Sequence, residues 1–180
     1  KPRRLIVFDL TCIGLTQTGA LIWGFYAIHS QQPVSVNYHD GSFYSMTVEP
    51  LRIEKFPETL PSGLSDRRPA LVYVAPPADE DEETRAAMQE MMGSVAPHED
   101  PFFFRPFAAH WAGVEPKAVD AARRSRDSAA FAAELPGFLD RHGGQAGDYR
   151  FFPYTGRYGA CTVAFSAAGE LVDALGCEKI

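Results

Sequence analysis

The chain has 180 residues, of which 46% are hydrophobic and 22% are charged, and its formal net charge is −6. This balance is typical of one globular domain and excludes a disordered polypeptide. The negative charge disfavours a protein that coats nucleic acid over its whole surface, because such binding requires many basic side chains to neutralise phosphates. No apolar run approaches the thickness of a bilayer, so we expect no membrane span.

The cysteine content predicts free thiols. Cys12, Cys161 and Cys177 lie far apart, without the short spacing of a zinc site. Three is also a poor number for a disulfide framework. We therefore expect reduced cysteines and an intracellular protein, in the cytosol, the nucleus or an organelle such as the mitochondrion.

Three strands are predicted at the start of the chain. Residues 4–10 form a short apolar run that ends in an acid, which favours a central strand buried on both faces. After a polar turn, residues 20–29 predict a second strand. Residues 43–48 predict a third, preceded by a hairpin turn at Asp40-Gly41. The chain is therefore expected to open with an antiparallel meander.

The middle of the chain, residues 55–108, is predicted to be an insertion into a single domain of residues 1–180, because its first part is rich in proline, serine and charge. Within it, residues 70–75 predict an extra strand, and residues 84–92 predict a helix that follows an acidic run. Residues 97–106, with three consecutive phenylalanines, predict a loop packed on the domain or on a partner. One face of the predicted helix is also expected to pack: Ala87, Met88, Met91 and Met92.

The last third of the chain predicts a helix, a strand and a second helix. Asp127 is expected to cap the first helix, which runs to about His142. Residues 149–153 predict a buried strand. Residues 158–175 predict a helix, although Gly169 within it is unfavourable for a helix interior. The first helix carries an apolar stripe at helical spacing: Phe131, Leu135, Phe138 and Leu139.

The run FDLTCIGL at residues 8–15 resembles the first motif of the DEDD 3′–5′ exonucleases, F-D-x-E-T-T-G-L. Residues 113–119 resemble the family's H-G-I/V-x-P-x-x-V helix start, and residues 151–175 resemble the strand and helix that carry its second motif. The resemblance implies an α/β protein with a ribonuclease-H-like mixed sheet, which opens with the three-strand meander and has helices packed on it. The family's third motif is not reached before Ile180, so a truncated form of that fold is expected.

The resemblance also implies a reaction, the hydrolysis of a terminal phosphodiester by a pair of Mg²⁺ or Mn²⁺ ions that carboxylates hold. Asp9 matches the first of these acids, but Thr11 stands where a glutamate is expected. No acid occurs between Asp148 and Glu170, where the second motif should supply one. We therefore predict no catalytic residue and no cofactor. Asp9 is a metal ligand only if the chain is active with Mg²⁺ or Mn²⁺.

Basic and aromatic side chains form a second kind of candidate site, because together they can follow a nucleic-acid backbone and stack on its bases. Such residues cluster before the helix with the apolar stripe and around the strand predicted at residues 149–153. The nucleic-acid-binding candidates are Arg123, Arg124, Arg126, Arg150, Tyr154 and Arg157.

The main prediction is a non-catalytic exonuclease-like domain that serves as a structural or scaffold subunit of a larger assembly. Its partners are then other protein subunits. The missing carboxylates and the aromatic loop favour this role. Two alternatives stay open: a module that binds RNA or single-stranded DNA without cleaving it, and an active metal-dependent 3′–5′ exonuclease.

Overall fold

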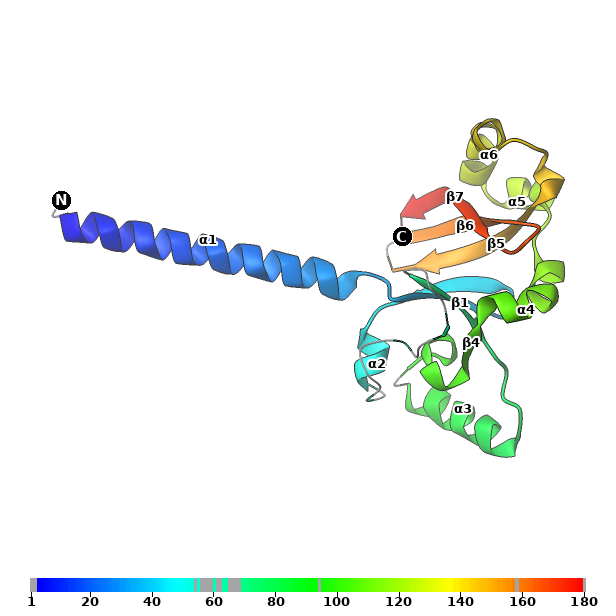
Figure 1. Ribbon diagram of the computed structural model, residues 1–180, viewed down its shortest axis with the longest axis horizontal. Coiled ribbons are helices and arrows are strands. Elements are labelled where there is room, and N and C mark those ends of the chain that lie inside the picture. The colour runs from blue at the N-terminus through cyan, green and yellow to red at the C-terminus, as the bar shows by residue number, and fades with distance from the viewer. Residues whose placement is uncertain are drawn as a thin grey trace. The chain divides into compact units, whose positions relative to one another are not determined.

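The computed structural model describes residues 3–53, 55, 60, 63–64, 69–93, 95–157 and 159–179, with side chains from Val7 to Glu178 (Figure 1). The chain falls into two compact units, Lys1–Gln32 and Pro33–Ile180. The first unit holds one long helix. The second holds a sheet with helices packed on it.

The first unit consists of helix α1 (Arg3–Gln31). The strands predicted at residues 4–10 and 20–29 are therefore wrong, and so is the three-strand meander that they were expected to form. A helix satisfies its backbone hydrogen bonds internally and needs no partner strand. The polar segment predicted as a turn is part of the helix, and its threonine hydroxyls are satisfied locally by donating to carbonyl groups four residues earlier. These bonds of 2.8–2.9 Å run from Thr11 to Val7, from Thr16 to Cys12 and from Thr18 to Gly14.

The second unit is built on one seven-stranded mixed sheet with the order β4-β3-β1-β2-β5-β6-β7. The pairs β1–β3 and β2–β5 are parallel, and the other neighbouring strands are antiparallel. This sheet and its helices confirm the α/β class. The strands are β1 (Ser35–His39), β2 (Ser42–Met46), β3 (Ala70–Val74), β4 (Phe104–Pro106), β5 (Tyr149–Gly156), β6 (Gly159–Ser166) and β7 (Leu171–Lys179).

Several predicted strands are confirmed. Residues 43–48 overlap β2, and the turn before it has positive φ at Asp40 (43°) and Gly41 (82°), as a tight hairpin requires. Residues 70–75 overlap β3, and residues 149–153 form the start of β5. Both β3 and β4 come from the segment predicted as an insertion, and both pair within the same sheet.

The helix predicted at residues 158–175 is wrong, because β6 and β7 occupy this part of the chain. β6 pairs with β5 along its whole length, and the turn into β7 uses Gly169 at a φ of 80°.

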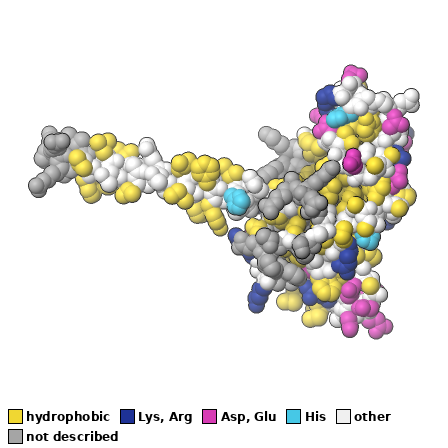
Figure 2. Space-filling view, viewed as in Figure 1, with side chains coloured by type: hydrophobic (Ala, Val, Ile, Leu, Met, Phe, Trp, Pro, Cys, Tyr) yellow, Lys and Arg dark blue, Asp and Glu magenta, His cyan; other side chains and the backbone are white. Residues whose placement is uncertain are grey.

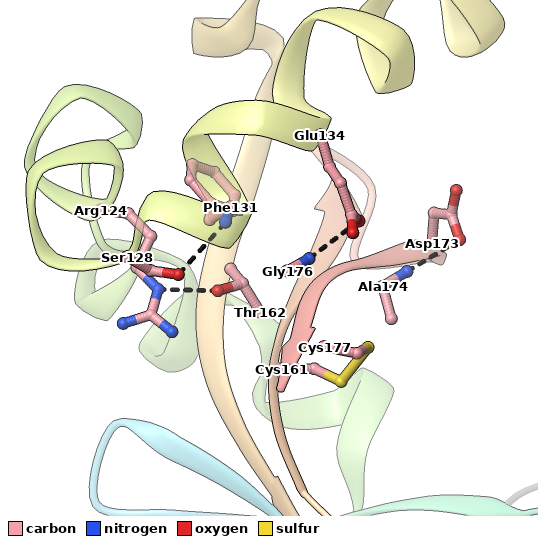
Figure 3. The surroundings of a disulfide bond; sticks show 10 residues. All are labelled: Arg124, Ser128, Phe131, Glu134, Cys161, Thr162, Asp173, Ala174, Gly176 and Cys177. Carbon is pink, nitrogen blue, oxygen red and sulfur yellow. Dashed lines mark hydrogen bonds between the residues drawn. A yellow bond between two sulfur atoms is a disulfide. The ribbon is translucent and has the colours of Figure 1, made fainter. Parts of the chain in front are cut away.

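The prediction of reduced cysteines is also wrong for Cys161 and Cys177, which form a disulfide between β6 and β7 (Figure 3). Cys12 is free and exposed.

Two backbone N–H groups of the outer strand β7 donate hydrogen bonds to carboxylates (Figure 3). Ala174 N donates to Asp173 Oδ1 at 2.9 Å, and Gly176 N donates to Glu134 Oε2 at 2.9 Å. β7 pairs with β6 on one side and ends the strand order on the other. These two donors are therefore not offered to a further strand.

Helices and short 3-10 turns cover the sheet (Figure 1). The helix predicted at residues 84–92 is confirmed as α3, which Gly93 ends at a φ of 61°. The helix with the apolar stripe is confirmed as α6, although its cap is Ser128 rather than Asp127, with Ser128 Oγ accepting from Phe131 N at 3.2 Å. The helical elements of this unit are α2 (Glu49–Ile53), α3 (Glu80–Met92), η1 (Pro97–Glu99), η2 (Pro101–Phe103), α4 (Phe107–Val114), η3 (Glu115–Lys117), α5 (Ala121–Asp127), α6 (Ala129–His142) and η4 (Ala146–Asp148).

The packing predicted for one face of α3 is wrong, because no residue of this helix is buried. α3 contacts the core through Ala86, on a different face. The phenylalanine loop, in contrast, packs on the domain as predicted, with Phe103 and Phe104 buried. The predicted packing face of α3 is exposed: Ala87, Met88, Met91 and Met92.

Among the described residues, three hydrophobic clusters pack the sheet against its helices. Successive residues of a strand point to opposite faces, so Phe152 packs on the α4 side whereas Phe151 packs under α6. The α4 side carries one cluster, which includes Phe43 and Phe165. The other side carries two clusters, one against α2 and α3 and one against α5 and α6. Their fully buried members are Met46, Leu51 and Val72 in the first, and Phe131, Phe138, Phe151, Ala164 and Leu175 in the second.

Phe43 lies where the two halves of the sheet meet. β2 and β5 pair through Phe43 with Tyr154 and Tyr44 with Thr155. The ring of Phe43 is fully buried, and its centroid lies 5.0 Å from that of Phe165. This short parallel pairing is therefore supported by aromatic packing.

We expect Phe43→Ala to lower the free energy of unfolding by about 3–5 kcal/mol, because it removes a buried ring and leaves a cavity. Urea denaturation followed by tryptophan fluorescence measures the change. Leu171→Ala, at an exposed position of β7, is the matched control and should cost less than about 1 kcal/mol. Equal losses in the two variants would contradict the role assigned to Phe43.

Reduction of the Cys161–Cys177 disulfide should also destabilise the second unit. The bond joins residues with a sequence separation of 16. Restricting the unfolded chain by a loop of this size contributes about 3 kcal/mol. Urea denaturation with and without a reductant measures this difference, and Cys12→Ser should respond to the reductant as the parent does. A Cys161→Ser/Cys177→Ser variant as stable as the oxidised parent would argue against the bond.

Candidate functional site

Helix α1 exposes large apolar side chains on every side. An α-helix turns about 100° per residue, so Phe25 points in the same direction as Val7, whereas Ile13 and Trp23 point to other sides. A helix that is apolar all round is normally enclosed by other apolar groups. These side chains are each between 53% and 70% exposed: Val7, Phe8, Leu10, Ile13, Leu15, Leu21, Ile22, Trp23, Phe25, Tyr26 and Ile28.

The charged residues of α1 lie near its start. They are Arg3, Arg4 and Asp9, so residues 10–28 contain no aspartate, glutamate, lysine or arginine. Gln17 and three threonines are the polar residues between Leu10 and Leu21, and each threonine hydroxyl donates within the helix. Within the described part of the chain, no helix combines the length and the apolar character that crossing a membrane requires.

Asp9, which matches the exonuclease motif, lies on the exposed surface of α1. The strand end on which the motif places this acid is therefore not formed. A lone carboxylate on an exposed helix does not fit a pair of divalent ions, which need several oxygen ligands. Among the residues that the structure describes, no three histidine, cysteine, aspartate or glutamate side chains come together as a metal site.

The predicted nucleic-acid-binding arginines of α5 lie on the sheet face that α5 and α6 cover. Arg124 reaches the sheet, where its Nε donates to Thr162 Oγ1 at 2.7 Å (Figure 3). Arg123 forms an exposed ion pair of 4.0 Å with Asp127. Arg126 is exposed in the last turn of the helix.

The remaining candidates lie elsewhere. Arg150 Nε donates to Glu115 Oε1 at 2.8 Å, next to α4, and Tyr154 packs against the cluster on the α4 side. Arg157 follows β5 in the turn to β6. Arg150 and Tyr154 therefore lie on the opposite face of the sheet from the α5 arginines, and the six candidates do not form one surface.

A cluster of rings at His39, Tyr44 and His98 was missed by sequence reasoning. The His98 ring stacks on Tyr44 with centroids 4.2 Å apart and lies 6.3 Å from the His39 ring. The backbone oxygen of His98 accepts from Nδ2 of the buried Asn37 at 2.7 Å, which fastens η1 to the sheet. Strand alternation places Asn37 and His39 on one face, but no local pattern predicts that His98 arrives there.

Burial shifts the pKa of His98, in this cluster, and of the neighbouring Glu99. It lowers the pKa of His98 to about 4, and the charge of His39 acts in the same direction. Burial also raises the pKa of Glu99, against a hydrogen bond from the Ala96 backbone. His98 is therefore neutral at pH 7, and its stacked ring connects η1 to β2.

No family model, curated protein or solved structure matches this chain. The relationship to the DEDD exonucleases therefore stays a prediction. Of the features described above, the exposed apolar surface of α1 is the most extensive. It gathers residues of one chemical character on one element, whereas the predicted basic residues are divided between two faces of the sheet.

Protonation of His98 should weaken the second unit at acidic pH. Its pKa is about 4 in the folded chain against an ordinary value of 6.5, so the unfolded chain binds the proton more tightly. Stability should therefore fall as the pH drops from about 6.5 towards 4. With allowance for solvent screening of this half-buried ring, we expect a loss of about 1–2 kcal/mol. Urea denaturation at a series of pH values measures it.

A His98→Gln variant should lose this part of the pH dependence. His29→Gln, at an exposed position of α1, should keep it. An NMR titration of the His98 ring gives a direct reading. A midpoint near the ordinary value of 6.5 would show that the ring is not buried as described.

Proposed function

We propose that the chain is a structural, non-catalytic subunit of a larger protein assembly, and that α1 is the element that holds it there. The observation that supports this proposal is the exposure of large apolar side chains on all sides of α1. Burying one such side chain contributes about 1.5–3 kcal/mol. Enclosure of the helix by a partner is therefore strongly favoured over its exposure to water.

A group of partner helices is the environment that we propose for α1. Such a group surrounds a helix with apolar side chains and also offers hydrogen-bonding partners for Asp9 and Gln17. The threonine hydroxyls add no unpaired polar group, because they already donate to the α1 backbone. Lipid is the competing environment, and a crosslinking experiment distinguishes the two.

The ribonuclease-H-like fold is a finer assignment than the α/β class, and it remains a prediction. Its first motif, residues 8–15, lies on α1. The proposed structural role therefore rests on the exposure of α1 and not on that assignment. Binding of nucleic acid ranks below it, because the candidate basic residues divide between two faces of the sheet and several of them pair within the domain.

We further propose that the assembly lies in an oxidising compartment. Disulfides such as Cys161–Cys177 persist there and are rare in the cytosol and the nucleus. The prediction of free thiols led us to expect the cytosol, the nucleus or an organelle. Of these three, an organelle with oxidising conditions fits the disulfide, and the reducing cytosol does not.

A photoreactive amino acid at Leu15 or Trp23 should crosslink the full chain to one protein of defined mass in the cells that produce it, because both positions are exposed on α1. The same group at Leu171 of β7 is the control and should not give that product. Mass spectrometry identifies what is attached. Crosslinks to lipid alone, or the same product from Leu171, would overturn the proposed role of α1.

A second measurement tests the non-catalytic part of the proposal. The purified chain, incubated with Mn²⁺ and an end-labelled single strand of RNA or DNA, should leave the strand intact. Asp9→Ala provides the background, because it removes the acid that matches the exonuclease motif. Cleavage by the parent that disappears in Asp9→Ala would instead support the active-exonuclease alternative.

A further inference from the structure

Helix α3 presents a row of methionines to solvent. Met88, Met91 and Met92 are 54%, 84% and 72% exposed, although each is a large apolar side chain. Their spacing of i, i+3 and i+4 places them on one face of the helix. Methionine is overrepresented on surfaces that bind varied partner helices, because its unbranched and polarisable side chain adapts its shape.

A different side of α3 is fixed to the domain. Arg85 Nε lies 3.3 Å from Oδ2 of the fully buried Asp100, and the guanidinium lies 4.8 Å from the ring centre of Phe102. Ala86 packs against the cluster that contains Val72. Rotating the methionines inward would separate Asp100 from Arg85, which is costly for a buried carboxylate. The methionine row therefore stays outside the domain.

Carboxylates continue the methionine row at the start of the helix. The first turn of α3 contains four acids, and its last turn contains no basic residue. Helical spacing places Asp81 in line with Met88 and Met92, and Glu80 in line with Met91. Figure 2 shows acidic side chains gathered at one end of α3, beside hydrophobic ones. We define the outer face of α3 as Glu80, Asp81, Met88, Met91 and Met92.

We propose that the outer face of α3 binds an amphipathic helix of a protein partner. The partner's apolar residues lie on the methionine row, and its lysine or arginine residues lie beside Glu80 and Asp81. The methionines supply the apolar area. The carboxylates select a basic helix, because they repel an acidic one, and their place at one end of the methionine row sets the direction of the bound helix. Arg85 is the basic residue of α3 and is engaged with Asp100. α3 belongs to the second unit and α1 to the first, so the inference does not rest on the proposed function.

Two synthetic helices of equal length test this binding with the full chain. One has leucine and lysine in an amphipathic pattern, and in the other glutamate replaces every lysine. Fluorescence anisotropy should show saturable binding of the lysine peptide, weakened by added salt, and no binding of the glutamate peptide. The variant Met88→Gln/Met91→Gln/Met92→Gln should weaken binding of the lysine peptide roughly tenfold or more. Glutamine preserves the helix, because its helix propensity is close to that of methionine.

The matched control removes exposed apolar side chains that lie on neither α1 nor α3. Ile53→Gln/Leu171→Gln, on α2 and β7, should leave the affinity for the lysine peptide unchanged. A Glu80→Lys/Asp81→Lys variant should shift the preference towards the glutamate peptide. Equal binding of both peptides by the parent, an unchanged affinity in the methionine variant, or an equal loss in the Ile53→Gln/Leu171→Gln control would each overturn the proposal.

Discussion

The contact of Phe43 with Phe152 and Phe165 is the interaction on which the second unit depends. The strands β1 to β4 come from residues 35–106, whereas β5 to β7 come from residues 149–179, and a short parallel pairing joins the two groups. A parallel pair cannot be closed by a tight turn, and this one pairs only Phe43 with Tyr154 and Tyr44 with Thr155, so ring packing adds support to a short ladder. The rings of Phe152 and Phe165 lie 5.5 and 5.0 Å from Phe43, and Phe107 of α4 covers them at 5.6 Å from Phe43.

The parts of the fold that could be predicted from the sequence are those with a local pattern. The stripe of α6 repeats at helical spacing, and Asp40-Gly41 suits a tight hairpin because both residues tolerate positive φ. The apolar runs in residues 4–29 and 158–175 fit a helix or a strand equally well. The first forms a helix, which needs no partner, whereas the second pairs with β5 and carries a disulfide. That pairing depends on residues elsewhere in the chain.

The candidate sites were harder to predict, because they depend on which surface each element presents. Arg124 and Arg150 look alike in the sequence, but one lies over the α5 side of the sheet and the other beside α4. The methionines of α3 have the spacing of a core stripe. Their exposure follows from the orientation of the helix, which the contact of its Arg85 with Asp100, outside the helix, fixes. Helical spacing identifies the members of such a face, but only tertiary contacts decide whether that face is covered.

The carboxylates that accept from the β7 backbone have a consequence for copies of this protein that stand close together. Open sheet edges are the places where separate molecules fuse into continuous fibre-like stacks. Asp173 and Glu134 hold the Ala174 and Gly176 donors, so an incoming strand finds them already engaged. At the other edge, the three-residue β4 ends in Pro106, which has no N–H to offer. Subunits can therefore be packed at high local concentration while each keeps its own sheet.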